Sequence, residues 1–163
     1  MNTPPSSDAG KTPPGKFVDP ANNGTDFLAA LPHGKAFRFV DEVLELTGGK
    51  SGTARYAVRG NEAFLEGHFP GNPMVPGVIL IEALAQWGGV IAQSDFAIPA
   101  LENLRLTAVR QAKITGSAIP GETLEIRAEV IARLGNLIQV RGQIHVQPGT
   151  RLVLQGEITL SGD

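Results

Sequence analysis

Cysteine is absent from the 163-residue sequence. This absence excludes a disulfide framework, thiol nucleophiles and cysteine-based zinc sites, and it fits a cytoplasmic protein. An excess of charge of one sign is also lacking, because 14 basic and 16 acidic residues give a formal net charge of −2. Without a global positive field, binding to RNA or DNA is disfavoured.

Long hydrophobic runs are missing as well. No stretch offers the roughly 18 uninterrupted apolar residues of a membrane span, and the N-terminus lacks the basic and then apolar run of a secretory signal. We therefore expect no membrane partner. The hydrophobic fraction of 42% is sufficient for one domain with a core.

The first 25 residues differ in composition from the rest of the chain. They contain five prolines, three glycines and several serines and threonines, with almost no large apolar side chains. Such a segment cannot bury enough apolar surface to fold. The sequence therefore predicts a disordered tail over residues 1–25 and a folded domain over residues 26–163.

The stretch from Gly67 to Trp87 organises the remainder of the chain. Its first half contains Pro70, Pro73 and Pro76, which lack an amide donor and predict a loop. From Gly77 to Ala92 the residues are apolar on nearly every face. A helix of this kind is stable only when it is buried all round, so we predict a central helix with Trp87 in the core.

Two polar side chains interrupt this helix, and a histidine precedes it. Glu82 and Gln86 are four residues apart and share one helical face. A carboxyl group in apolar surroundings favours its protonated form, which suits a proton donor. His68 is a candidate base, and the Gly77 amide at the helix start has no partner within the helix. Together these are the parts needed to remove a proton next to a carbonyl and expel a leaving group.

The rest of the sequence predicts antiparallel strands. Phe37 to Leu46 and Gly52 to Val58 form the expected first hairpin, and an extended region follows Ile98. Apolar and polar residues then alternate through three segments, with turns at Gly135-Asn136 and Pro148-Gly149. In the first of these segments the residues expected to face the core are Leu124, Ile126, Ala128, Val130, Ala132 and Leu134. An α+β fold follows, in which a three-stranded meander wraps one long helix.

The central motif resembles a known family. His-Phe-Pro-Gly-x-Pro-x-x-Pro-Gly-Val from His68, followed by Glu-Ala-x-Ala-Gln to Gln86, is similar to the bacterial 3-hydroxyacyl-[acyl-carrier-protein] dehydratases of FabZ type. Leu31-Pro32-His33 upstream and Pro120-Gly121 downstream support the resemblance. It implies a hotdog fold, a curved antiparallel sheet around the central helix, assembled as a homodimer or as three such dimers.

The same resemblance implies a reaction and roles for the motif residues. A (3R)-3-hydroxyacyl thioester, on acyl carrier protein or coenzyme A, would lose water to give the trans-2-enoyl thioester in fatty-acid or related biosynthesis, without any cofactor. His68 of one subunit would act with Glu82 of the other. Gly77 would hold the thioester oxygen and Gln86 would hold Glu82. The neighbouring Phe69 and Pro76 are expected substrate contacts.

The sequence departs from the FabZ-type pattern in one region, and two other functions compete with dehydration. The run before Pro120 lacks an arginine that FabZ-type chains usually carry, so carrier identity and chain length stay open, although Arg105, Arg110 and Lys113 keep local positive charge. Glutamate at position 82, where a branch that also isomerises the double bond usually has aspartate, favours simple dehydration. A hotdog thioesterase and a catalytically silent subunit that binds acyl carriers are the competing hypotheses.

Two further histidines are assigned no catalytic role. His33 lies in a loop and His145 at an outward position of a strand. A lone histidine in such a place is usually a solvated or hydrogen-bonded structural residue, and the sequence assigns that role to both.

Overall fold

The C-terminal third folds into the meander that its alternating pattern predicts. In the computed structural model, which describes residues 27–28 and 31–163, β4 (Thr123–Leu134), β5 (Leu137–Gln147) and β6 (Arg151–Ser161) follow one another. Neighbouring strands pair antiparallel. The inward residues of β5 are fully buried: Ile138, Val140, Ile144 and Val146. One face of the meander is therefore covered along its length.

Three more strands widen the meander into a six-stranded antiparallel sheet. β1 (Glu42–Thr47) and β2 (Ser51–Ala57) form a hairpin whose second strand joins β4. β3 (Arg105–Ile114) joins β6 at the other side, so the strand order is β1-β2-β4-β5-β6-β3. β1 and β3 are the two edges of this sheet.

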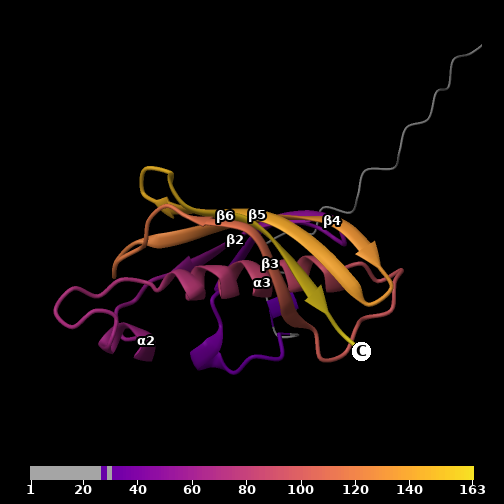
Figure 1. Cartoon of the computed structure of the whole chain (residues 1–163), viewed down its shortest axis with the longest axis horizontal. Coiled ribbons are helices and arrows are strands. Elements are labelled where there is room, and N and C mark those ends of the chain that lie inside the picture. Colours follow the sequence, from indigo (N-terminus) through magenta and orange to yellow (C-terminus); the bar gives the residue numbers. More distant parts are fainter. Residues whose placement is uncertain (1–26, 29–30) are drawn as a thin grey trace, which may run out of the picture.

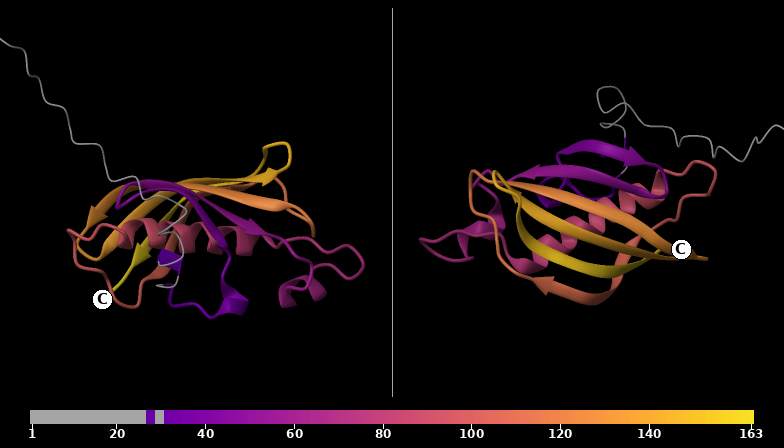
Figure 2. Two further views of the ribbon diagram at one scale, coloured as in Figure 1. Left: turned by 180° about the vertical axis from the view of Figure 1, so that it is seen from behind. Right: turned by 90° about the horizontal axis from the view of Figure 1, so that it is seen from above.

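The predicted central helix is α3 (Gly77–Gln93), and the sheet curves around it. The helix runs along the concave side of the sheet (Figure 1), and a view from above shows the strands crossing it (Figure 2). Trp87 is fully buried and its Nε1 donates a hydrogen bond to the carbonyl of Gly52 over 3.0 Å. A Cβ at Gly52 would lie 2.5 Å from the Trp87 ring, so glycine permits this close approach. The predicted α+β hotdog architecture is confirmed.

The first predicted strand is shorter than expected. Lys35–Phe37 is a short 3₁₀ helix, η1, and paired strand begins only at Glu42. The reason is that the backbone of Phe37 and Phe39 bonds to the side chain of Gln86 on α3 instead of to a neighbouring strand. This segment therefore lies across the helix before it enters the sheet.

The prediction of which β4 residues face the core is wrong at the end of the strand. Leu124, Ile126 and Ala128 are buried as expected, but Leu134 is 78% exposed. An irregularity in the pairing between Val130 and Ala132 shifts the register by one residue, and such a shift turns the following side chains to the opposite face. Arg133 takes the inward register, where its guanidinium donates to the carbonyls of Ala92 and Pro99.

The predicted tail over residues 1–25 lies outside the described residues, so the domain boundary at residue 26 stays a prediction. Phe27 and Leu28, the first described residues after it, are helical. Among the residues that the structure describes, no helix has the length and apolar character needed to cross a membrane.

Candidate active site

His68 lies in the loop that joins the short helix α2 (Ala63–Glu66) to α3. The loop projects past the sheet at the N-terminal end of α3 (Figures 1 and 2). Nδ1 of His68 lies 3.0 Å from the carbonyl oxygen of Met74. Because a carbonyl oxygen only accepts, the neutral ring carries its hydrogen on Nδ1 and a lone pair on Nε2. The histidine is thus set up to remove a proton through Nε2.

Backbone contacts hold this loop in one conformation. The amide of Met74 donates to the carbonyl of His68 over 3.0 Å, and the amide of His68 donates to that of Leu65 over 3.2 Å. The His68 ring also stacks on Phe69 with centroids 4.2 Å apart, while Phe69 is itself 53% exposed. The His68 ring is therefore oriented before any substrate binds.

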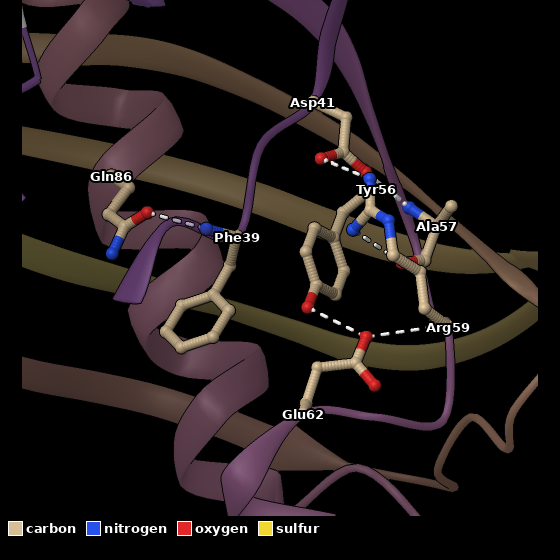
Figure 3. A network of polar contacts seen from close by, with 7 residues as sticks. All are labelled: Phe39, Asp41, Tyr56, Ala57, Arg59, Glu62 and Gln86. Carbon is tan, nitrogen blue, oxygen red and sulfur yellow. Dashed lines mark hydrogen bonds and ion pairs between the residues drawn. The ribbon is translucent and has the colours of Figure 1, made fainter. Parts of the chain in front are cut away.

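A polar network fixes the entry to α2 and hence the loop after it (Figure 3). The Glu62 carboxylate accepts hydrogen bonds from the Tyr56 hydroxyl over 3.0 Å, from the Arg59 amide over 2.8 Å and from the Gly60 amide over 2.7 Å. Asp41 completes the network through an ion pair of 2.8 Å with Arg59. These contacts tie the β2 end to the segment that leads to His68.

The network shifts the pKa values of two of its members. Burial raises the pKa of Tyr56 well above its ordinary value, and the Glu62 charge adds to the effect. Burial opposes ionisation of Glu62, but the hydrogen bonds that it accepts outweigh this and lower its pKa below the ordinary value of 4.5. Glu62 is therefore a structural carboxylate at neutral pH.

Glu82 lines a cavity of about 460 Å³ that follows one face of α3. The helical residues on this face are Glu82, Ala85, Gln86, Gly89, Val90 and Gln93. Leu104, Leu106 and Leu160 form an apolar wall from the sheet side. The Glu82 side chain is 22% exposed, so it faces this cavity and not a wetted helix surface.

Gln86 shares a helical face with Glu82, as the spacing predicts, and it holds Glu82 as the family resemblance implies. It is 3% exposed, and its Nε2 donates to Oε1 of Glu82 over 3.0 Å and to the carbonyl of Phe37 over 2.9 Å. Its Oε1 accepts from the amide of Phe39 over 2.9 Å (Figure 3). All hydrogen-bonding groups of this amide are engaged, so its orientation is fixed.

His33 is the site residue that sequence reasoning missed. Its Nε2 lies 3.3 Å from Oε1 of Glu82, and it lines the same cavity. The structural role assigned to it from the sequence is therefore insufficient. The only signal was its place in Leu31-Pro32-His33, because a distance of 49 positions in sequence gives no hint of contact with Glu82.

Gly77 and Pro76 stand where the motif predicts them. Gly77 is the first residue of α3 and Pro76 is its N-cap, so the Gly77 amide has no acceptor within the helix. A Cβ at Gly77 would lie 2.6 Å from Cδ1 of Ile114 on β3. Glycine therefore allows β3 to approach the start of the helix.

Two neighbouring glycines on α3, Gly88 and Gly89, differ in their surroundings. A Cβ at Gly88 would lie 2.8 Å from Val140, so glycine at position 88 is needed for packing against the sheet. A Cβ at Gly89 would lie 3.4 Å from Leu104, an ordinary contact distance. Gly89 thus faces space in which a side chain would fit.

Aromatic side chains line the end of the cavity that is far from Glu82. Phe27 and Phe96 line it, and their rings stack with centroids 5.9 Å apart. The loop that carries Phe96 is tied to α3 because the Gln93 amide donates to the carbonyl of Leu101 over 2.7 Å and accepts from its amide over 3.1 Å. The cavity therefore has a polar end at Glu82 and an aromatic end near Phe96.

His68 and Glu82 are not brought together within one chain. His68 is not among the residues that line the Glu82 cavity, and no contact joins the two among the described residues. Apolar side chains are exposed near this part of the molecule at Val78, Val109 and Ile114, the last two on the edge strand β3. Within the described residues of one chain, His68 and Glu82 therefore stay separate.

Comparison with known proteins gives consistent results. A family profile described as a FabA-like domain matches residues 31–157. Curated relatives include the 3-hydroxyacyl-[acyl-carrier-protein] dehydratase FabZ of Sorangium cellulosum, 36% identical over 82% of this chain and 86% of the relative. That of Campylobacter fetus is 37% identical over 78% of this chain and 88% of the relative.

Solved structures share the fold at lower identity. The dehydratase heterocomplex ApeI:P from Xenorhabdus doucetiae has a TM-score of 0.69 and 16% identity, over 86% of this chain and 91% of that one. Zebra fish thioesterase superfamily member 2 has a TM-score of 0.64 and 15% identity, over 90% of this chain and 99% of that one. These likenesses support the architecture alone.

Proposed function

The chain belongs to the FabA-like family, and on that premise we propose that His68 and Glu82 carry out its reaction as base and acid. The protein is a hydro-lyase, a 3-hydroxyacyl-[acyl-carrier-protein] dehydratase of fatty-acid biosynthesis, like its curated relatives. The observation that carries the proposal for the site is an imidazole with a bare Nε2 beside the same helix that presents a carboxyl group to an apolar cavity.

Dehydration divides into two proton transfers. Nε2 of His68 takes the proton from C2 of the substrate, and the electron pair left on C2 moves toward C3 to form the double bond. The C3–O bond breaks, and protonated Glu82 gives its proton to the departing hydroxyl group, which leaves as water. Return of the proton from the His68 imidazolium to the Glu82 carboxylate, through water, restores the enzyme.

Charge on the thioester oxygen needs a donor while C2 loses its proton. The amide of Gly77 is available at the positive end of the α3 dipole. Phe69 and Pro76 flank the base and the oxyanion donor, and they are the proposed walls for the thioester. Gln86 holds the acid through its bond of 3.0 Å to Oε1 of Glu82.

We place each site across two copies of the chain. The separation of His68 from the Glu82 cavity supports this placement, and β3 offers an unpaired strand edge with exposed Val109 and Ile114. Addition of β3 to its counterpart in a second copy would cover this edge. His68 of one copy would then face Glu82 of the other in a homodimer.

The cavity along α3 is the proposed place for the acyl chain. Its polar end presents Glu82 for the 3-hydroxyl group, and its leucine-lined wall suits methylene groups. The pantetheine and the acidic carrier would remain outside the cavity, and Arg105, Arg110 and Lys113, which are exposed along β3, are the proposed contacts for the carrier.

Hydration of crotonyl thioesters by the purified protein tests the function. We expect loss of the absorbance of the conjugated thioester without release of free thiol. Release of thiol would identify a thioesterase, and no change on either acyl carrier protein or coenzyme A would identify a silent subunit. The carboxylate alone would suffice for thioester hydrolysis, so the prepared Nε2 of His68 favours dehydration.

A further inference from the structure

Glu82 has a second polar neighbour in the cavity, His33. We propose that His33 is a positioning residue that acts with Gln86 to make Oε1 of Glu82 an acceptor, so that Oε2 carries the proton given to the departing hydroxyl group. The inference rests on the proposed role of Glu82 as the acid. It assigns the two oxygens of this carboxyl group different tasks.

The contact with Gln86 fixes the character of Oε1. The Gln86 amide nitrogen lies 3.0 Å from Oε1 and can only donate. Its own carbonyl oxygen is occupied by the amide of Phe39, so the side chain cannot turn over without losing that bond. Oε1 therefore accepts a hydrogen bond, and the acid proton of a neutral Glu82 belongs on Oε2.

His33 approaches the same oxygen from another segment of the chain. Its Nε2 lies 3.3 Å from Oε1, slightly beyond the usual hydrogen-bond length. Its Nδ1 is buried without a partner among the described residues. A hydrogen on Nδ1 would leave a buried donor unsatisfied, so the neutral ring carries its hydrogen on Nε2, the ring nitrogen that lies near Oε1. Such contacts tighten when substrate binds.

The segment that carries His33 is itself held in place. The Arg38 guanidinium donates from Nε to the carbonyl of His33 over 2.7 Å and from Nη2 to that of Leu31 over 3.3 Å. Pro32 between them has a restricted φ. Gln86 binds the backbone of Phe37 a few residues further on. The same amide that holds Glu82 thus also helps to hold the chain that brings His33 to it.

Substitution of His33 tests the proposal through kcat. His33→Ala should lower kcat by about 10- to 100-fold, the range found when a residue that orients a reactive ligand is removed. KM should change by no more than about twofold, because the wall proposed for the acyl chain is formed by Leu104, Leu106 and Leu160. His33→Gln places an amide nitrogen near the position of Nε2 and should recover most of the rate. His33→Asn is too short and should resemble His33→Ala.

His145 provides a matched control. It is the other histidine with a buried, unpartnered Nδ1 in the described part of the chain, but it lies on β5 and does not line the cavity. His145→Ala should keep the wild-type kcat. If His33→Ala keeps kcat within about twofold, or if His33→Asn recovers as much as His33→Gln, the proposal is overturned.

A second variant separates positioning from a general effect on folding. In a Glu82→Gln background the proton that His33 helps to place is gone, so adding His33→Ala should leave the residual rate unchanged within about twofold. The same fold-loss in both backgrounds would overturn the role of His33. Full activity of Glu82→Gln alone would instead refute the proposed function of Glu82, so the two failures are distinguishable.

Discussion

Gly89→Met should shorten the range of acyl chains that the enzyme accepts. Gly89 stands seven residues after Glu82 on the cavity face of α3, a separation of about 10 Å along the helix axis. An extended peptide spans about 3.6 Å per residue, which has three backbone bonds, so an extended acyl chain advances about 1.2 Å per bond. The carbon chain therefore passes Gly89 about eight bonds beyond C3.

The expected fall in kcat/KM follows from the number of substrate methylenes that can no longer be buried in the cavity. Methionine is flexible enough to occupy the space beside Leu104, and it would block a 14-carbon substrate from about its eleventh carbon. Loss of burial for about four methylenes at about 0.8 kcal/mol each corresponds to about 10²-fold in kcat/KM. An eight-carbon substrate ends before the block and should react at the wild-type rate. Hydration of matched 2-enoyl thioesters of both lengths measures the two values.

Gly89→Ala is the matched control, since a Cβ at this position contacts Leu104 at 3.4 Å and Leu160 at 3.8 Å without overlap. It should preserve kcat/KM for both lengths. If Gly89→Met leaves the 14-carbon substrate unaffected, or lowers both substrates equally, the acyl chain does not run along this face of α3.

Three further predictions concern the base, the polar network and the interface. His68→Ala should lower kcat by about 10²-fold or more without a change in thermal unfolding, and full turnover would exclude His68 as the base. Because the folded pKa of Glu62 lies below 4.5, its stabilisation is present above that pH and is lost as pH falls through the folded value. Glu62→Gln should thus lower the free energy of unfolding in urea by about 1 kcal/mol at pH 7. It should also reduce the loss of this free energy on acidification, and an unchanged dependence of the unfolding free energy on pH below 4.5 would contradict this. Val109→Asp should give inactive monomers in gel filtration, and an active monomer would contradict the shared site.

The parts of the fold that follow a strict period were predictable from the sequence. The apolar run after Pro76 could only be a buried helix, and the alternation through β5 matches its burial residue by residue. The end of β4 was not predictable, because a single extra residue between Val130 and Ala132 reverses which side chains face the core. The alternation of apolar and polar residues does not reveal such an irregularity.

The site was predictable where its residues lie close in sequence. The spacing of Glu82 and Gln86 predicted their shared helical face, the family resemblance implied their contact, and the motif predicted Gly77 at the helix start. The contact of His33 with Glu82 depends on how the segment before β1 crosses α3. That crossing is set by tertiary hydrogen bonds to Gln86, which no period in the sequence encodes.

Mixing two inactive variants tests most directly whether the site joins two chains. His68→Ala retains Glu82, and Glu82→Gln retains His68, so a mixed dimer contains one complete site out of two. Random exchange makes about half of the dimers mixed, and the mixture should regain about a quarter of wild-type activity. No recovery after subunit exchange has been verified by mass spectrometry would contradict a site formed by His68 of one chain and Glu82 of the other.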